Sequence, residues 1–339
     1  MRGSTKAILG GLAFCVLLVI LSRALSSYYL VLSTRILIFA IFAMSLDLLV
    51  GYTGRSSLGH AAFFGFSGYA TGLFALKVSN NLILTIGAAV LVTFLMALIF
   101  SALALRARGV YFLMLTLALS QVIWGIAFEW RALTGGDDGL PGVPRPVIGP
   151  YHLTDSSSFF LFTGGMFVIS AAILLLIVRS PFGLTLQGIR ESASRMSALG
   201  YNVWLHEYLA FLISAIFAGA AGSLLAYQNG IVSPTQLFVV SSAEALLMVI
   251  LGGAGTMIGP FFGSVVVVLL EYLVSQHTER WVTALGIIYI MVVVGAPRGI
   301  YPPMRDFVIR RLRRGKGPKA AVSVPLPEPA PGITMGADT

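Results

Sequence analysis

Long apolar runs, separated by short polar or glycine-rich segments, dominate the pattern of this 339-residue chain. A helix needs about 20 consecutive apolar residues to cross the hydrocarbon core of a bilayer. Such runs predict about ten membrane-spanning helices, near residues 7–25, 30–50, 58–76, 82–105, 110–128, 159–178, 208–228, 240–256, 260–275 and 282–296. Residues 240–275 allow a second interpretation, a re-entrant helix pair around Gly252–Pro260. The pattern indicates an all-α polytopic membrane protein.

Composition and charge agree with this class. The chain is 57% hydrophobic and 10% charged, with a mean hydropathy of +0.91, values that exclude an ordinary soluble domain. If the N-terminus is cytoplasmic, most Lys and Arg residues fall in cytoplasmic segments, as the positive-inside rule expects. The net charge of +9 then follows from topology and from contact with anionic membrane lipid. Both termini are therefore predicted to be cytoplasmic, and no nucleic-acid partner is expected.

The first apolar run follows Arg2 and Lys6 and could be mistaken for a secretory signal. Its length of about 19 apolar residues exceeds that of a signal-peptide core, so an uncleaved first span is expected. The single cysteine, Cys15, lies inside this run, and one chain can therefore form neither a disulfide nor a cysteine metal cluster. The sequence shows no metal-ligand spacing and no catalytic nucleophile–base constellation.

One glycine-rich break lies between Leu46 and Ala61, where a hydrophobic run gives way to small polar residues and then resumes as an apolar helix. Non-helical backbone is tolerated at membrane depth only where it packs in protein or lines a wet cavity, and glycine-broken segments often mark a transport pathway. A plain cytoplasmic turn, or glycines that only let helices pack closely, are the alternatives. The candidate pathway residues, polar first and then apolar, are Gly51, Gly54, Ser56, Ser57, Gly59, His60, Phe63 and Phe64.

A long outer loop runs from about residue 129 to 158 and contains the glycine- and aspartate-rich stretch 134–144. Loops of this length in a compact protein are usually functional or disordered. Acidic residues outnumber arginines there, and their spacing does not match an EF-hand. The preferred interpretation is a docking surface for a protein outside the membrane, with the candidate residues Thr134, Asp137, Asp138 and Gly139.

The inner loop, residues 179–206, is too polar to span a membrane. Its apolar residues recur at helical spacing, at Leu186, Ile189, Ala193, Met196 and Leu199. Gly200 fits a C-terminal cap in the left-handed conformation. This pattern predicts a short amphipathic helix over 190–200 that seats its apolar face in a cytoplasmic partner. A surface helix with no partner is the alternative.

Four stretches together resemble one protein family: the broken segment, the loop at 137–144, the helix at 190–200 and the run 242–256, which reads SAEALLMVILGGAGT. In order and spacing they resemble the LivM-type permeases of bacterial branched-chain amino acid ABC importers, over roughly residues 30–300. The resemblance implies a type II importer-like fold with broken helices, a paralogous second permease subunit, two cytoplasmic ATPase subunits and a periplasmic or lipid-anchored substrate-binding protein. It also implies an ATPase-coupling loop made of Ile189, Arg190, Glu191, Ala193, Met196, Leu199 and Gly200.

Two positions depart from the family's pattern. Ala193 stands seven positions before Gly200, where the coupling helix commonly carries an acidic residue. This departure bears on how the helix would contact the ATPase and not on whether it does. Asp47 stands where relatives usually carry an uncharged Asn. The ionisation state of this side chain at the broken helix is therefore left open by the resemblance.

No G-x-x-x-x-G-K-[ST] phosphate loop occurs in the sequence. The chain is therefore expected to be no enzyme and to hold no cofactor, with ATP and Mg²⁺ bound by the partner ATPase subunits. The alternative function is ion-coupled secondary transport of a small polar or amino acid solute, with Asp47, His60, Glu244 and Glu271 as candidate relay residues. Arg35 and Glu271 are expected to pair with neighbours or to snorkel rather than bind substrate.

The expected organisation has three parts. Residues 1–29 form an N-terminal span and the first outer turn, 30–300 the permease core, and 301–339 a basic juxtamembrane segment with a disordered Pro-rich cytoplasmic tail. The expected function is the passage of branched-chain, hydrophobic amino acids across the bacterial inner membrane. The sequence does not distinguish leucine, isoleucine or valine from other hydrophobic amino acids as substrates, or from the urea and short amides that related permeases carry.

Overall fold

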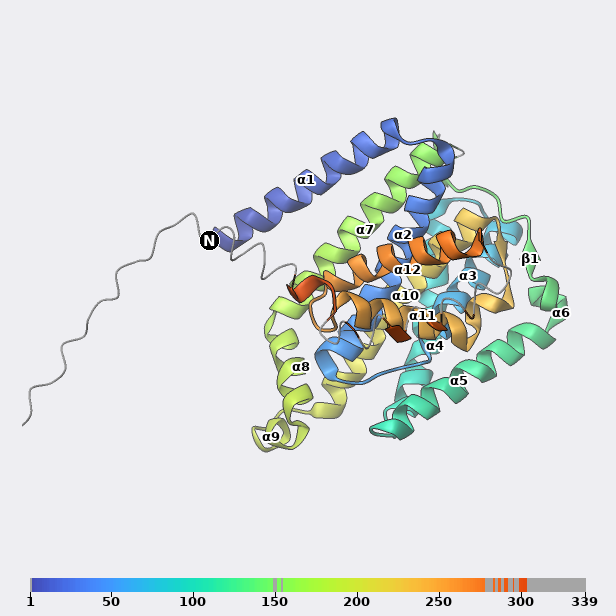
Figure 1. Cartoon of the computed structure of the whole chain (residues 1–339). Helices are drawn as coiled ribbons and strands as arrows, with labels where there is room; N and C mark the ends of the chain where they lie inside the picture. The colour runs from blue at the N-terminus through green and yellow to red at the C-terminus, as the bar shows by residue number, and fades with distance from the viewer. Residues whose placement is uncertain are drawn as a thin grey trace, which may run out of the picture. The chain divides into compact units, whose positions relative to one another are not determined.

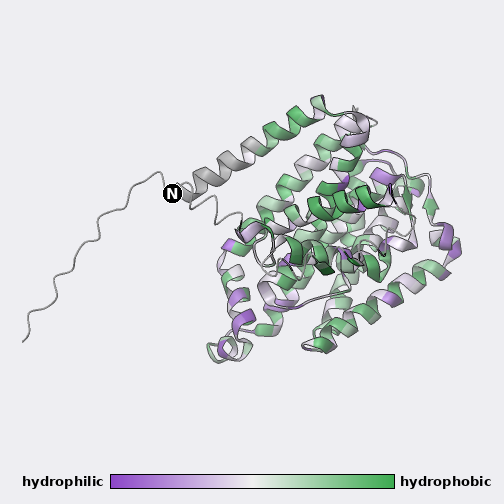
Figure 2. Ribbon diagram, viewed as in Figure 1, coloured by the Kyte–Doolittle hydropathy of each residue, from purple (hydrophilic) through white to green (hydrophobic). Residues whose placement is uncertain are grey.

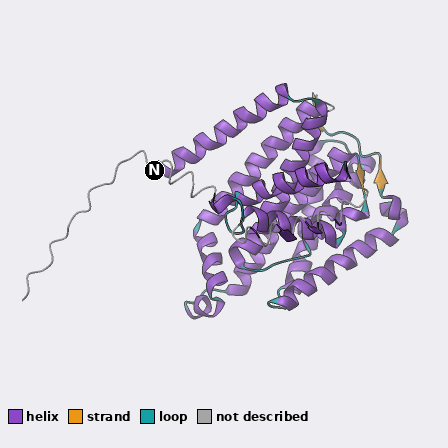
Figure 3. Ribbon diagram, in the orientation of Figure 1, coloured by secondary structure: helices purple, strands orange, loops and turns teal. Residues whose placement is uncertain are grey.

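The computed structural model describes residues 2–148, 151–153 and 155–277, together with scattered positions between 283 and 303. Over these residues the protein is almost entirely helical, with a few two-residue strands (Figure 1, Figure 3). Within this described part, five helices are long and apolar enough to cross a membrane, namely Ser27–Thr53, Leu82–Ala104, Val110–Glu129, Ser156–Arg179 and Val203–Asn229. The predicted all-α polytopic fold class is confirmed.

The helices follow the predicted apolar runs closely. The long ones are α1 (Arg2–Ala24), α2 (Ser27–Asp47), α3 (His60–Lys77), α4 (Leu82–Ala104), α5 (Val110–Glu129), α7 (Ser156–Arg179) and α10 (Val203–Asn229). The small elements are a π turn η1 (Leu48–Thr53), α6 (Arg131–Thr134), η2 (Gly136–Asp138), β1 (Leu140–Pro141), β2 (Val147–Ile148), β3 (Tyr151–His152), α8 (Pro181–Glu191), α9 (Ala193–Ala198), β4 (Ile231–Val232) and η3 (Pro234–Leu237).

The segment 240–275 forms a pair of short helices, α11 (Val239–Gly252) and α12 (Gly259–Ser275). They have 14 and 17 residues, fewer than the roughly 20 that a full crossing takes. They pack against each other and are joined by a non-helical loop at 253–258. This arrangement favours the alternative interpretation, a re-entrant pair, over the two full spans that the apolar runs predicted. The predicted span at 282–296 lies largely, and the tail from residue 304 entirely, outside the described residues.

The core lies around α2, α3 and α10. In the most apolar window of each helix, 89% is buried in Ser27–Thr53 and 78% in α10, against 28% in α4, 22% in α5 and 33% in α7. The peripheral helices α4, α5 and α7 are apolar along most of their length (Figure 2), as expected of helices that face lipid. The N-terminal helix α1 packs along α7, where Leu18 lies against Gly164 and the rings of Phe14 and Phe167 are 5.5 Å apart.

Helices α3 and α10 approach closely because small residues line their contact. A Cβ atom at Gly222 would lie 1.8 Å from the carbonyl oxygen of Phe64, so this position requires glycine. Beside it, Ser67 Oγ and Thr71 Oγ1 lie 2.8 and 2.9 Å from Ser223 Oγ in a buried hydroxyl network. Small residues and paired hydroxyls of this kind are common where membrane helices pack.

Contacts between connecting segments agree with the predicted alternation of the chain between two sides of a membrane. At the end predicted to be outside, β1 (Leu140–Pro141) pairs antiparallel with β4 (Ile231–Val232). At the end predicted to be inside, the segment after α2 contacts the loop after α4 and the start of α10, through Arg55, Ala107 and Glu207. Segments predicted to lie on the same side therefore contact each other.

Replacing Gly222 with Ala should destabilise the bundle by about 1–3 kcal/mol, because the added methyl group overpacks the contact between α3 and α10. The matched control is Gly87→Ala in α4, where nothing lies within 4 Å of an added Cβ atom. Thermal unfolding of the purified protein in detergent measures the difference. Size-exclusion chromatography after heating gives the folded fraction at each temperature. Equal unfolding midpoints for the two variants would contradict this description of the contact.

Candidate functional site

The break between α2 and α3 is the most irregular part of the membrane core. Helix α2 continues without a gap into the π turn η1 (Leu48–Thr53), which ends at Gly54 with φ +74°. Residues 55–59 are not helical, and α3 begins at His60. Turns of π-helix inside longer helices are often found at functional sites. The predicted break is confirmed, and its first half is wound as a π turn.

Asp47, the last residue of α2, connects this turn to the loop between α11 and α12. Its carboxylate accepts hydrogen bonds from the backbone N–H groups of Gly255, at 2.7 Å, and Met257, at 2.9 Å. Because the side chain is fully buried, these bonds supply the partners that a buried carboxylate requires. Met257 has φ +59°, the one positive φ of a non-glycine residue among the described positions. Asp47 therefore holds a strained loop against the end of a membrane helix.

Glycine lets the two backbones touch at this point. A Cβ atom at Gly51 would lie 2.3 Å from Asp47 Oδ1 and 2.3 Å from the backbone nitrogen of Gly255. A side chain at Gly51 would therefore separate the π turn from the loop, and Gly255, at φ +80°, has a backbone conformation that favours glycine. The close-packing interpretation of the glycines therefore holds at Gly51, while its place on a transport pathway stays a prediction.

Arg190, the penultimate residue of α8, joins the inner loop to the same point. Its Nη1 atom donates a hydrogen bond to the carbonyl oxygen of Gly51. A Cβ atom at Gly54 would lie 3.0 Å from Arg190 Cγ, and one at Gly255 would lie 3.1 Å from Arg190 Nη1. Three segments distant in sequence thus meet here, and we call the meeting residues the glycine joint: Asp47, Gly51, Arg190, Gly255 and Met257.

The inner loop differs from the single helix predicted over 190–200. Ser192, with φ −161° and ψ 99°, separates α8 from α9. Its side-chain oxygen accepts a hydrogen bond from the backbone N–H of Arg195 and so caps the start of α9, a role that hydroxyl residues favour. The prediction of one continuous helix is therefore wrong. Gly200 has φ +89°, as the predicted left-handed cap requires.

Some apolar residues of the inner loop are buried within this chain, and others are exposed. Leu186 and Ile189 are buried in the core of this chain, whereas Leu199 is 72% exposed. Met196 lies between these extremes, with its sulfur against Gly188. The predicted outward apolar face is therefore wrong at Leu186 and Ile189. Helical spacing reveals that a face is apolar but does not say which protein buries it.

A groove of about 490 Å³ opens between α8, α9 and the start of α10. Its lining is partly aromatic, and the rings of Phe182 and His206 stack with their centroids 5.8 Å apart. Figure 2 shows that α8 and α9 are among the more polar parts of the chain. The residues that line the groove are Pro181, Phe182, Leu184, Thr185, Met196, Tyr201 and His206.

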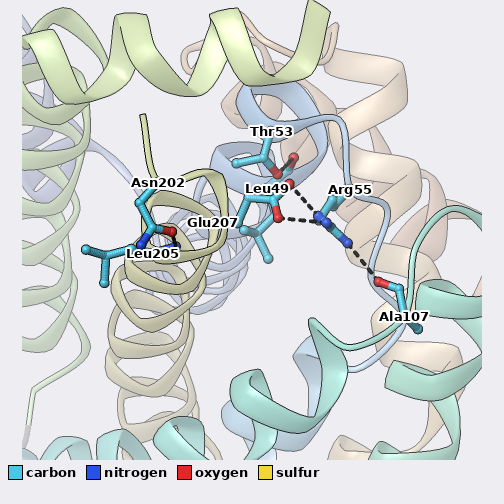
Figure 4. A network of polar contacts seen from close by, with 7 residues as sticks. All are labelled: Leu49, Thr53, Arg55, Ala107, Asn202, Leu205 and Glu207. Atoms are coloured by element: carbon cyan, nitrogen blue, oxygen red, sulfur yellow. Dashed lines mark hydrogen bonds and ion pairs between the residues drawn. The ribbon is translucent and has the colours of Figure 1, made fainter. Parts of the chain in front are cut away.

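A buried ion pair fastens the non-helical segment to its surroundings (Figure 4). Arg55 Nε and Nη2 donate to the two carboxylate oxygens of Glu207 at 2.8 and 2.7 Å, and Nη1 donates to the carbonyl oxygen of Ala107 at 3.0 Å. The guanidinium carbon also lies 5.1 Å from the ring centre of Phe112. Sequence reasoning missed Glu207. Its one signal was an acid at the edge of the predicted span 208–228, where a charge needs a partner.

His60, predicted to lie on the pathway, forms a fully buried polar chain. Its Nε2 atom lies 2.6 Å from Ser214 Oγ, which donates its own proton to the carbonyl oxygen of Ser45. Because that hydroxyl proton is already used, Nε2 must carry the ring proton and donate it to Ser214. The other ring nitrogen lies 3.4 Å from Ser57 Oγ.

The neighbouring predicted pathway residues also lie in the core. Phe63 and Phe64 are fully buried, and Phe64 stacks on Phe42 with ring centres 4.4 Å apart. Gly59 is buried as well, and Ser56 is half-buried. In this structure these side chains fill the space between α2, α3 and α10. Their role in a pathway stays a prediction.

The predicted outer docking residues fall into two kinds. Thr134 is buried and its hydroxyl donates to a main-chain carbonyl of α5 at 2.6 Å. A Cβ atom at Gly139 would lie 2.2 Å from a main-chain oxygen of β4, so this glycine serves the fold of the loop. Asp137 and Asp138 are exposed on the turn η2.

A second ion pair links α2 to α12. Arg35 of α2 and Glu271 of α12 form an ion pair at 2.8 Å, which confirms their predicted pairing. In the part of the chain that the structure describes, no group of three or more His, Cys, Asp or Glu side chains is placed to hold a metal ion.

Comparison with known proteins gives the family. The family model described as "Branched-chain amino acid transport system / permease component" matches residues 28–296. The chain is 26% identical over 311 residues to the high-affinity branched-chain amino acid transport system permease protein LivM of Salmonella typhimurium, which covers 85% of this chain and 73% of that protein. The protein of the same name from Escherichia coli K12 is 25% identical over the same shares.

A second group of relatives matches a shorter stretch. A probable branched-chain amino acid transport permease protein LivH of Methanocaldococcus jannaschii is 27% identical over 127 residues, 35% of this chain and 40% of that protein. No solved structure matches the chain. With apolar helices that are long enough to cross a membrane and a family model that spans most of its length, the chain belongs to the permease components of branched-chain amino acid transport systems.

Proposed function

We propose that this permease works as the membrane subunit of an ATP-driven importer in the bacterial inner membrane. With a paralogous second permease, it would form the path by which branched-chain amino acids cross. The family description and the names of the LivM relatives support this substrate class. The shorter match to LivH proteins supports a paired arrangement of two related permeases.

The observation that carries the proposal is the hydrogen bond between Arg190 and the carbonyl oxygen of Gly51. Arg190 belongs to a polar loop outside the predicted spans, whereas Gly51 belongs to the break in the most deeply buried span. A partner that moves α8 would act directly on the backbone of this break. The glycine joint is therefore a suitable place for the work of a cytoplasmic ATPase to reach the membrane core.

ATP hydrolysis belongs to separate subunits in this proposal, because the chain lacks a phosphate loop. Two ATPases would bind ATP and Mg²⁺ and dock at the inner loop. The groove between α8 and α9 supplies the surface for one of them, with the exposed Leu199 and Leu184 as apolar contacts and the exposed Glu191 and Arg195 as polar ones.

A substrate-binding protein would dock on the opposite side. The exposed Asp137 and Asp138 are the candidate contacts, on a turn that β1 and β4 hold in place. Thr134 and Gly139, also predicted as docking residues, would support the turn from beneath.

Reconstitution in liposomes tests the proposal as a whole. The complex with the second permease, both ATPases and the binding protein should take up leucine when ATP is supplied to the ATPase side. The chain alone should take up none under a proton or sodium gradient. Gradient-driven uptake by the chain alone would contradict the proposal and favour an ion-coupled carrier.

Replacing Arg190 with Gln should lower ATP-driven leucine uptake about fivefold, because it removes a hydrogen bond of about 1 kcal/mol between the inner loop and the π turn. Lys should not restore uptake, since its single ammonium lacks the reach and planar fork of the guanidinium. Co-purification with the ATPases should persist. The control is Arg108→Gln, an exposed position in the inner connection between α4 and α5. Uptake by the Arg190 variant at the level of the Arg108 variant would contradict the role of the joint.

A further inference from the structure

A second charged cluster lies on α2, α11 and α12, apart from the glycine joint. Arg35 Nη2 lies 2.8 Å from Glu271 Oε1, and the guanidinium carbon lies 5.6 Å from the ring centre of Phe39. Arg35 follows the start of α2 by eight residues, which at 1.5 Å per residue places it about 12 Å along the helix. Glu244 belongs to α11, which packs against both α2 and α12.

The side chains of this cluster are more exposed than those of the ion pair between Arg55 and Glu207 at the other end of the bundle. The side chains of Arg35 and Glu271 are 42% and 19% exposed, against 13% and 7% for Arg55 and Glu207. Arg55 makes three hydrogen bonds, whereas Arg35 makes one to the described residues. Within the same described part, Glu244 has no hydrogen bond or ion pair of its own. The cluster therefore keeps polar capacity that the described residues do not use.

Charged side chains are rare and costly in lipid, and those found within membrane spans almost always face protein or a water-filled cavity. The exposed side of this cluster is therefore a poor surface for lipid and a suitable wall for a polar solute. Two carboxylates beside one guanidinium leave one negative charge without a positive partner in the cluster. The ammonium group of an α-amino acid supplies that positive partner, and its carboxylate can accept from the N–H groups of Arg35 that bond no described residue.

Apolar residues beside the charges fit the rest of such a solute. Val31 lies one helical turn before Arg35, and Val240 lies one turn before Glu244, so each shares a helix face with its charged neighbour. Val31 is 44% exposed and Val240 is 48% exposed. A branched aliphatic side chain could rest on these two valines while its polar end meets the charges.

We propose that Arg35, Glu244 and Glu271 form a transient binding station for the carboxylate and ammonium groups of an amino acid on the exposed face of α2, α11 and α12. Arg35 receives the carboxylate, and Glu244 and Glu271 receive the ammonium group. This inference rests on the proposed transport of amino acids and names where the permease contacts them. It places substrate contact away from the buried residues around His60.

Uptake and ATP hydrolysis by the complete reconstituted complex test the station, at saturating leucine-loaded binding protein. Glu244→Gln breaks no ion pair that the structure records, so assembly and ATP hydrolysis should match the wild type. Leucine uptake per ATP hydrolysed should fall about tenfold, the scale expected for loss of a charge-assisted hydrogen bond. Arg35→Gln should give the same result. The controls are Arg23→Gln and Glu129→Gln, exposed charges in the predicted outer half of the bundle, which should behave as wild type.

Thiol accessibility gives an independent readout if Arg35→Gln fails to assemble. In a Cys15→Ser background, a cysteine in place of Val31 should react with a water-soluble methanethiosulfonate, and leucine should slow this reaction. Glu244→Gln should abolish the protection by leucine. An unreactive cysteine, or a reaction that leucine does not slow, would overturn the station. In this experiment, the proposed function itself fails if the wild-type complex takes up no leucine with ATP. Normal wild-type uptake together with normal uptake by Glu244→Gln overturns the station alone.

Discussion

The arrangement of the inner half of this permease depends on the carboxylate of Asp47. A fully buried carboxylate is costly unless its oxygens are bonded, and here both oxygens accept backbone N–H groups, from Gly255 and Met257. Those two donors belong to the loop between α11 and α12. Asp47 itself ends the most buried helix of the bundle. One side chain thus fixes the position of the α11–α12 loop against the point where α2 turns into a π helix.

The other features of the joint follow from that contact. Because the loop lies directly on the π turn, Gly51 and Gly255 must lack side chains, and Met257 is held at a positive φ that it would otherwise avoid. The carbonyl oxygen of Gly51 is left facing the end of α8, where Arg190 bonds it. The inner loop therefore reaches the membrane core through backbone atoms that Asp47 has already fixed. At the same end of the bundle, the ion pair of Arg55 and Glu207 holds the segment that leads into α3.

Hydrophobic runs predicted the helices well because a bilayer sets both their length and their composition. The break between α2 and α3 and the left-handed Gly200 were also predictable, since glycine marks places where a helix ends or two backbones approach. The partners of Asp47 were not predictable, because they lie more than 200 residues away and no local pattern points to them. The membrane helices are apolar on all sides, so hydropathy gave no inward face, and the burial of His60, Phe63 and Phe64 became visible only in the structure. The stop at Ser192 depends on a cap that competes with a weak helical pattern.

The central claim is that Asp47 and Arg190 act on one connection between the inner loop and the membrane core. A double-mutant cycle tests it most directly, with leucine uptake per ATP hydrolysed measured in the reconstituted complex for Asp47→Ala, Arg190→Gln and the two combined. If each substitution breaks the same connection, the combined variant should lose no more uptake than Asp47→Ala alone. Losses that multiply would show that the two residues act independently and would contradict the claim.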